Sequence, residues 1–151
     1  MSIRVVVADD QDLVRAGLVL ILESHPDIEV VGEAADGLAA LEVARRLRPD
    51  VLLVDIRMPG LDGVEVTREV AGPDVPDPLA VVVITTFDLD EYVLGALRAG
   101  ARGFLLKDAG PELLVQAVHA AAAGDALIAP NVTRRLLATL ADRTPQTPVQ
   151  P

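Results

Sequence analysis

Apolar residues along the chain gather in five short runs, at residues 3–8, 28–32, 51–55, 80–85 and 103–106, separated by longer amphipathic stretches. Three of the runs contain the continuously apolar segments VVVA, VLLV and VVVI, which are typical of strands covered on both faces of a parallel sheet. The run 28–32 is shorter and more polar, and it predicts an edge strand.

The stretches between these runs carry the signals of helices. Apolar residues recur at helical spacing over 12–24, and Asp36 can cap a helix that ends at Arg48, before Pro49. Two further helices are expected to begin at the capping-box-like spacings Asp62/Glu65 and Asp88/Glu91, and the second of them to end at Gly100. A last helix is expected to begin at Pro111 and to end at Gly124. Strands and helices therefore alternate, which predicts an α/β fold: a flavodoxin-like, doubly wound parallel sheet of five βα units with strand order 2-1-3-4-5.

All of these elements lie within residues 1–124, which we expect to form one domain. Residues 131–143 predict one further short helix, and residues 144–151 have the composition of a flexible, extended linker. We therefore expect residues 125–151 to be a linker segment with a short helix and a disordered tail.

Composition narrows the classes of protein to which the chain can belong. The formal net charge is −10, so double-stranded DNA would repel this chain, which by itself is a poor candidate for a nucleic-acid binder. There is no cysteine, which excludes disulfides and thiolate metal sites. No apolar run reaches the roughly 18 residues of a membrane helix, and we expect a cytoplasmic protein with no membrane partner. Lys107 is the only lysine among 13 basic residues, which draws attention to its position.

The chemically active side chains gather where the predicted strands end. Asp9 and Asp10 follow the first strand, and Asp55 ends the third. Three carboxylates at one sheet edge repel each other, and a hard divalent cation, Mg²⁺ or Mn²⁺, relieves that repulsion. Thr85 and Thr86 end the fourth strand, and Lys107 ends the fifth. A hydroxyl and an ammonium group suit a phosphoryl group, and a central carboxylate such as Asp55 can become an aspartyl phosphate.

Each of these residues also has an ordinary interpretation when it is taken alone. Asp9 and Asp10 could cap the first helix, Asp55 could simply begin a loop, and Lys107 could be a solvated surface charge. Thr85 and Thr86 are common strand residues. All of them stand at neighbouring strand ends, and this coincidence favours a site that binds a cation and a phosphoryl group. The segment MPGLDG (58–63) supports it by forcing a turn directly after Asp55.

Four stretches of the sequence together resemble a known family. The stretches are VVVADDQDLVRAGL, PDVLLVDIRMPGLDGVE, VVVITTFDLDEYVLGALRAGARGFLLKD and AAAAGDALIAP. They resemble bacterial two-component response regulators, and most closely the receiver domains of the subfamily that carries a LuxR-type helix-turn-helix. The resemblance covers roughly residues 3–130.

The resemblance implies a role for each candidate residue. Asp55 would be phosphorylated, and Mg²⁺ would be held by Asp9, Asp10, Asp55 and the backbone carbonyl of Arg57. Thr85, with Thr86 beside it, and Lys107 would engage the phosphoryl oxygens, and Phe104 would turn inward when Thr85 moves. The phosphoryl donor would be the phosphohistidine of a sensor histidine kinase. The chain would be a switch and not an enzyme, with only its own phosphorylation and dephosphorylation as chemistry.

Members of this subfamily usually continue into a DNA-binding domain, which we expect to lie outside the residues given for this chain. We expect a receiver with its linker that controls transcription through such an output domain; the alternative is a stand-alone receiver. The first helix is more apolar than one buried face requires. We therefore predict that this helix, together with the fifth helix, forms a homodimer interface favoured by phosphorylation, with Leu13, Val14, Leu18 and Leu22 in it. The alternative is that the first helix simply packs thickly on the sheet.

Three rival functions can be compared with the sequence, and the second of them, a nucleotide-binding module, fails. A phosphatase of the haloacid-dehalogenase type would usually show Asp-x-Asp after the first strand and a cap region, whereas Asp9 and Asp10 are adjacent. A nucleotide-binding module would need a GxGxxG or Walker-type loop after the first strand, and neither is present. A pseudo-receiver, an interaction module that never takes phosphate, is distinguished only by a phosphorylation assay.

Overall fold

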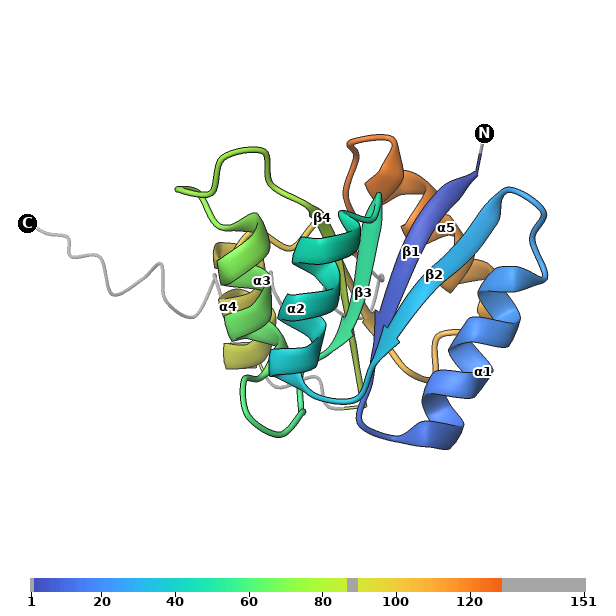
Figure 1. The fold of residues 1–151 in the computed structure, drawn as a ribbon, viewed down its shortest axis with the longest axis horizontal. Helices are drawn as coiled ribbons and strands as arrows, with labels where there is room; N and C mark the ends of the chain where they lie inside the picture. Colours follow the sequence, from blue (N-terminus) through green and yellow to red (C-terminus); the bar gives the residue numbers. More distant parts are fainter. Residues whose placement is uncertain (1, 87–89, 129–151) are drawn as a thin grey trace, which may run out of the picture.

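A parallel sheet forms the centre of the molecule (Figure 1). The computed structural model describes residues 2–86 and 90–128, apart from the side chains of residues 90–92 and 128. The strands are β1 (Ile3–Ala8), β2 (Ile28–Ala34), β3 (Val51–Asp55), β4 (Ala80–Thr85), β5 (Gly103–Leu106) and β6 (Leu127–Ile128). Their order is β2-β1-β3-β4-β5-β6, which confirms the predicted order of the first five strands and the position of β2 at an edge.

The strand β6 was not predicted. Its two residues, which the sequence analysis assigned to the linker segment, pair in parallel with Gly103 and Phe104 of β5. The amide of Leu127 donates to the carbonyl of Arg102 at 3.0 Å. A strand of two residues is too short to produce a hydrophobic period, so only the neighbouring strand reveals it.

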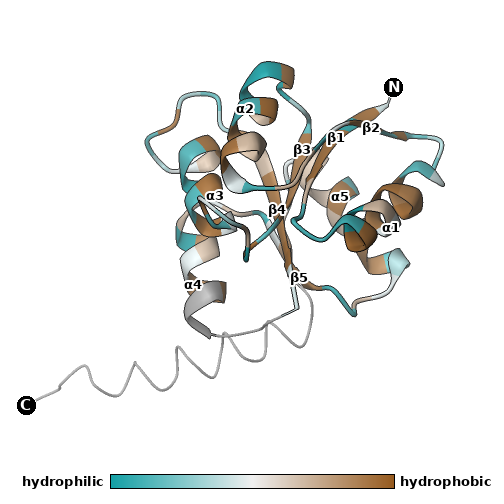
Figure 2. Cartoon of the chain, turned by 60° about the horizontal axis from the view of Figure 1, so that its bottom comes forward, coloured by the Kyte–Doolittle hydropathy of each residue, from teal (hydrophilic) through white to brown (hydrophobic). Residues whose placement is uncertain are grey.

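Helices cover both faces of the sheet and make a three-layer structure. The helices are α1 (Asp12–Glu23), α2 (Gly37–Leu47), α3 (Gly63–Ala71), α4 (Asp90–Arg98) and α5 (Pro111–Ala122). Figure 2 shows α2, α3 and α4 on one side of the strands and α1 with α5 on the other. The sheet is therefore buried on both faces, and every residue of β3 and β4 is buried. This is the arrangement that the continuous apolar runs predicted.

The helix ends agree with most of the sequence signals. The carboxylate of Asp36 accepts from the amide of Ala39 at 2.8 Å, and Asp62 and Glu65 form a reciprocal capping box. Pro111 is the first residue of α5. The fourth helix begins at Asp90, and the expected signal at Asp88 lies outside the described residues.

Some expectations fall on other undescribed parts of the chain. The predicted helix over 131–143 and the tail over 144–151 lie outside the described residues. Within residues 2–86 and 90–128, none of the helices has the length and apolar character needed to cross a membrane.

Candidate functional site

Three carboxylates meet where β1 and β3 end, at the lower edge of the sheet in Figure 1. Asp9 and Asp10 follow β1 directly, Asp55 is the last residue of β3, and the two strands are neighbours. One ligand oxygen from each of the three residues lies within 4.8 Å of the other two. Asp9 and Asp55 are buried, and Asp10 is exposed. The predicted convergence of these side chains is thus present in the fold.

The turn after β3 folds back tightly on Asp55. The amide of Gly63 donates to the carbonyl of Ile56 at 2.7 Å. A Cβ atom on Gly63 would lie 2.3 Å from the carbonyl oxygen of Asp55, so only glycine fits at the start of α3. The amide of Arg57 also points at Oδ1 of Asp55, at 3.4 Å. The MPGLDG segment therefore supports the backbone of Asp55 as well as turning the chain.

Lys107, at the end of β5, brings an ammonium group to two of the carboxylates. Its Nζ lies 2.8 Å from Oδ2 of Asp9 and 3.0 Å from Oδ2 of Asp55. The side chain is only 10% exposed, so these contacts are little screened by water. The backbone amide of Lys107 donates to the carbonyl of Thr85 at 2.8 Å, which fixes the residue to the end of β4.

One ammonium group shared between two buried carboxylates leaves an excess of negative charge. Burial raises the pKa of Asp55 and outweighs the hydrogen bond and charge of Lys107, which act in the opposite direction. Burial acts to lower the pKa of Lys107, but the close contacts and charges of Asp9 and Asp55 together raise it. The ammonium is therefore strongly held, while the carboxylate cluster still favours a further cation.

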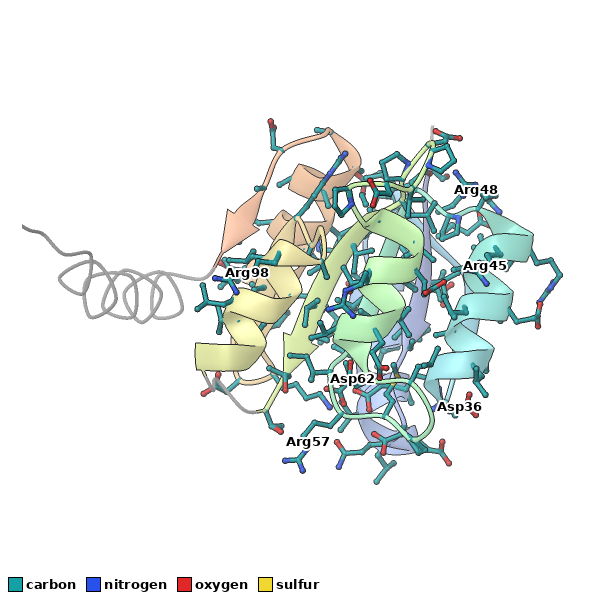
Figure 3. All side chains as sticks on the ribbon, turned by 90° about the vertical axis from the view of Figure 1, so that its left-hand side faces the viewer. Asp36, Arg45, Arg48, Arg57, Asp62 and Arg98 are labelled. Atoms are coloured by element: carbon teal, nitrogen blue, oxygen red, sulfur yellow. The ribbon has the colours of Figure 1, made fainter. Side chains whose placement is uncertain are left out.

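The carboxylate cluster suits a hard divalent cation. Although Oδ2 of Asp9 lies close to Lys107 Nζ, this buried oxygen makes no hydrogen bond to any residue that the structure describes. This ion-paired oxygen, which lacks an aligned hydrogen bond, forms with the two other carboxylates nearby a donor set that Mg²⁺ accepts. A surface depression beside them is lined by Asp10, Ile56, Arg57, Met58, Pro59 and Asp62. Figure 3 shows the side chain of Arg57 extending away from the fold at this end, so the backbone of Arg57 is the part suited to serve as a ligand.

Thr85, Thr86 and Phe104 occupy different environments. Thr85 is fully buried at the end of β4, whereas Thr86 is exposed. Phe104 lies in β5 opposite Val83, and its side chain is already fully buried. The resemblance implies that Phe104 turns inward on phosphorylation, and in this conformation the ring is already inside the core.

Two polar residues that the sequence analysis did not single out also contact the cluster. Gln11 donates its backbone amide to Oδ1 of Asp9 at 2.9 Å and accepts from Lys107 Nζ through Oε1 at 3.2 Å. Arg15 donates to the backbone carbonyl of Asp9 at 2.7 Å. Arg15 begins the second turn of α1, and helical side chains lean toward the N-terminus of their helix, which is the signal that could have found its contact with Asp9.

The predicted dimer residues on α1 need a correction. Leu18 and Leu22 are 8% and 0% exposed because they form the stripe that packs on the sheet, so including them in a dimer surface was wrong. Val14 is half-buried, and Leu13 is 90% exposed as expected. Leu20, seven residues from Leu13 and thus on the same side of the helix, is 74% exposed.

The chain is similar to known proteins over most of its length. Residues 5–119 match the family described as the response regulator receiver domain. The transcriptional regulatory protein YxjL of Bacillus subtilis is 44% identical over 126 residues, which are 83% of this chain and 57% of YxjL. The chain thus spans less than two thirds of that relative's length.

Solved structures show the same relationship. The signal receiver domain of the response regulator NarL from Mycobacterium tuberculosis is 45% identical, with a TM-score of 0.76 over 82% of this chain and 98% of that one. A two-component response regulator of the LuxR family from Aurantimonas is 30% identical, with a TM-score of 0.85 over 93% of this chain and 99% of that one.

Proposed function

The chain belongs to the family of response regulator receiver domains, as its motifs indicated, and from that premise we propose that it is a phosphoacceptor switch whose phosphorylated residue is Asp55. The observation that carries this proposal is the meeting of three carboxylates and the only lysine of the chain at one edge of the sheet. Asp9, Asp10, Asp55 and the backbone carbonyl of Arg57 would hold Mg²⁺ or Mn²⁺. The family match does not favour a phosphatase of the haloacid-dehalogenase type.

The geometry supports a simple phosphoryl transfer. A carboxylate oxygen of Asp55 attacks phosphorus, a P–O bond forms, and the P–N bond to the phosphohistidine of a sensor histidine kinase breaks. Lys107 then exchanges its contact with the carboxylates for a contact with the phosphoryl oxygens, and the hydroxyl of Thr85 donates to another of them. A bound magnesium ion would supply charge neutralisation for the incoming group. The burial of Asp55 limits the access of water to the product.

In the whole protein this switch would control transcription in the cytoplasm. The names of the relatives, a transcriptional regulatory protein and a regulator of the LuxR family, support a DNA-binding output domain joined to the receiver. The net charge of −10 supports DNA contact through that output domain and not through this chain. Phosphorylation adds a charge of roughly −1.5 to −2 at Asp55, which biases the receiver between two conformations.

Acetyl phosphate tests the phosphoacceptor directly. We expect wild-type chain incubated with acetyl phosphate and Mg²⁺ to gain one phosphoryl group by intact mass, and Asp55→Asn to gain none. Asp74→Asn, which removes an exposed carboxylate in the loop before β4, should still gain one. Phosphorylation of Asp55→Asn would contradict the assignment, and a wild-type chain that never gains the group would be a pseudo-receiver. Steady turnover of p-nitrophenyl phosphate would favour the phosphatase.

The output of the switch would include homodimerisation through the outer side of α1. Leu13 and Leu20 are exposed there, and a groove lined by Leu20, Ile21, His25, Val115 and His119, among others, continues this apolar surface to α5. Figure 2 shows α1 as apolar along most of its length, which supports a second copy of the chain as the partner.

Sedimentation of the phosphorylated chain tests this dimer. We expect a dimer for wild type at high concentration and a lower dimer fraction for Leu20→Ser, because the exposed leucine would be buried between the copies. Leu38→Ser is the matched control, since Leu38 is 64% exposed but lies on α2, across the sheet. A strictly monomeric wild type, or an equal loss in both variants, would contradict the proposed surface.

A further inference from the structure

Arg15 connects three separate parts of the chain around the acidic turn. It lies in the second turn of α1, its side chain is only 17% exposed, and its guanidinium group donates in three directions. One nitrogen donates to the backbone carbonyl of Asp9 at 2.7 Å, a second to Asp12 at 2.9 Å and a third to Glu33 of β2 at 3.0 Å. A planar guanidinium can satisfy several fixed acceptors at once, which a single ammonium cannot.

The turn between β1 and α1 has no side-chain N-cap for the helix that follows it. Gln11 occupies the N-cap position of α1, but its side chain makes no capping hydrogen bond and instead contacts Lys107. The same turn carries Asp9 and Asp10, whose charges repel Asp55. Lys107 offsets part of this repulsion by contacting Asp9 and Asp55, but it does not fix the orientation of the Asp9–Asp10 peptide.

Arg15 adds a restraint on that peptide by tying the carbonyl of Asp9 to β2. The amide of Asp9 donates directly to the carbonyl of Ala34 at 3.0 Å. The carbonyl of Asp9 accepts from Arg15, which is itself held by Glu33, the residue before Ala34. Both ends of Asp9 are thus anchored to the same strand, and the peptide that joins the two carboxylate-bearing residues has a fixed orientation.

We propose that Arg15 is a positioning residue for the cation site: it holds the Asp9–Asp10 peptide so that both carboxylates face Asp55 before a cation binds. The inference rests on the magnesium site of the proposed function. The positive charge of Arg15 would by itself weaken the binding of a cation, by Coulomb repulsion. When Arg15 is removed, the loss of positioning would raise the Kd for Mg²⁺, whereas the loss of its positive charge would lower it.

Titration of the full chain with Mg²⁺, monitored by calorimetry at constant ionic strength, measures the direction in which the Kd changes. For Arg15→Ala we expect the Kd for Mg²⁺ to rise by about tenfold, the size typical of losing a residue that orients a metal ligand. Arg15→Lys keeps the charge but cannot reach all three acceptors, so its Kd should rise as well. Arg46→Ala is the control, because Arg46 makes an exposed ion pair with Glu42 on α2 and contacts no residue of the cluster.

A metal-free measurement separates this inference from the proposed function. The backbone amide of Gln11 donates to Oδ1 of Asp9, so its hydrogen exchange reports the order of the turn without any cation. We expect this exchange to be faster in Arg15→Ala than in wild type. If wild type binds no Mg²⁺, the proposed metal site fails, and the exchange rate still shows whether Arg15 orders the turn.

Several outcomes would overturn the role of Arg15. If the Kd of Arg15→Ala for Mg²⁺ is unchanged or lower, Arg15 does not position the cation site, whether or not the amide of Gln11 exchanges faster. Unchanged exchange of the Gln11 amide overturns the role as well. If Arg15→Ala does not fold, Arg15→Lys and Glu33→Gln decide the question by the same two measurements, because each loosens the guanidinium contact while keeping a long polar side chain.

Discussion

Lys107→Met is expected to lower the unfolding free energy of the metal-free chain by about 3 kcal/mol, the usual cost of removing one partner from a buried ion pair. Asp9 is fully buried and the side chain of Asp55 is only 6% exposed, so both carboxylates depend on this ammonium for charge compensation. Methionine keeps the unbranched apolar stem of lysine, so the substitution tests the charge with little change in packing.

Urea unfolding near neutral pH, with EDTA present, measures this loss. Mg²⁺ should stabilise Lys107→Met more than it stabilises wild type, because no ammonium then competes with the cation for Asp9 and Asp55. The control is Arg45→Met, which breaks an exposed pair with Glu69 and should cost less than about 1 kcal/mol. A loss no larger than that of the control, or an equal response of both chains to Mg²⁺, would contradict the idea that Lys107 neutralises the cluster.

The position of the site could be predicted because it follows from topology. The apolar runs of β1, β3 and β4 are long enough and uniform enough to identify buried parallel strands from the sequence. Once the strand order is 2-1-3-4-5, the residues that follow these strands must meet at one edge. Asp55 and Lys107 stand 52 positions apart in the chain and come within 3.0 Å in the fold for this reason.

The division of the apolar residues on α1 could not be predicted in the same way. Most of its positions are apolar, so hydrophobicity does not mark the side that faces the sheet. Leu18 and Leu22 are core residues, whereas Leu13 and Leu20 face outward, and only the packing of α1 against β1 and β2 decides between these sets.

The supporting contacts around the site depend on tertiary distances that no local pattern encodes. The bond from Arg15 to Glu33 requires the register of β2 against β1, which is interrupted by an irregularity between Val5 and Val6. Sequence patterns therefore located the reactive groups and missed the residues that hold them in place.

Asp55→Asn is expected to be more stable than wild type without metal near neutral pH, by about 1 kcal/mol, since it removes one of the mutually repelling buried charges and leaves Lys107 paired with Asp9. Burial raises the pKa of Asp55 above its ordinary value of 3.8, so the folded wild type binds the proton more tightly than the unfolded chain does. Wild type therefore loses stability relative to the variant as the pH rises from below 3.8 through the raised pKa. The advantage of Asp55→Asn should be small in acid and should reach its full size above the raised pKa.

Urea unfolding midpoints of wild type and Asp55→Asn, measured from below pH 3.8 to neutral pH with EDTA or with saturating Mg²⁺, test which chain is more stable and whether the charge of Asp55 is the reason. Mg²⁺ should reverse the order of stability, because the wild-type chain offers the cation a carboxylate that the variant lacks. Asp125→Asn, which removes an exposed carboxylate beyond α5, should shift neither series. An advantage of Asp55→Asn that does not change with pH would show that the charge of Asp55 is not its source, and an advantage that persists in Mg²⁺ would show that Asp55 does not help to bind the cation.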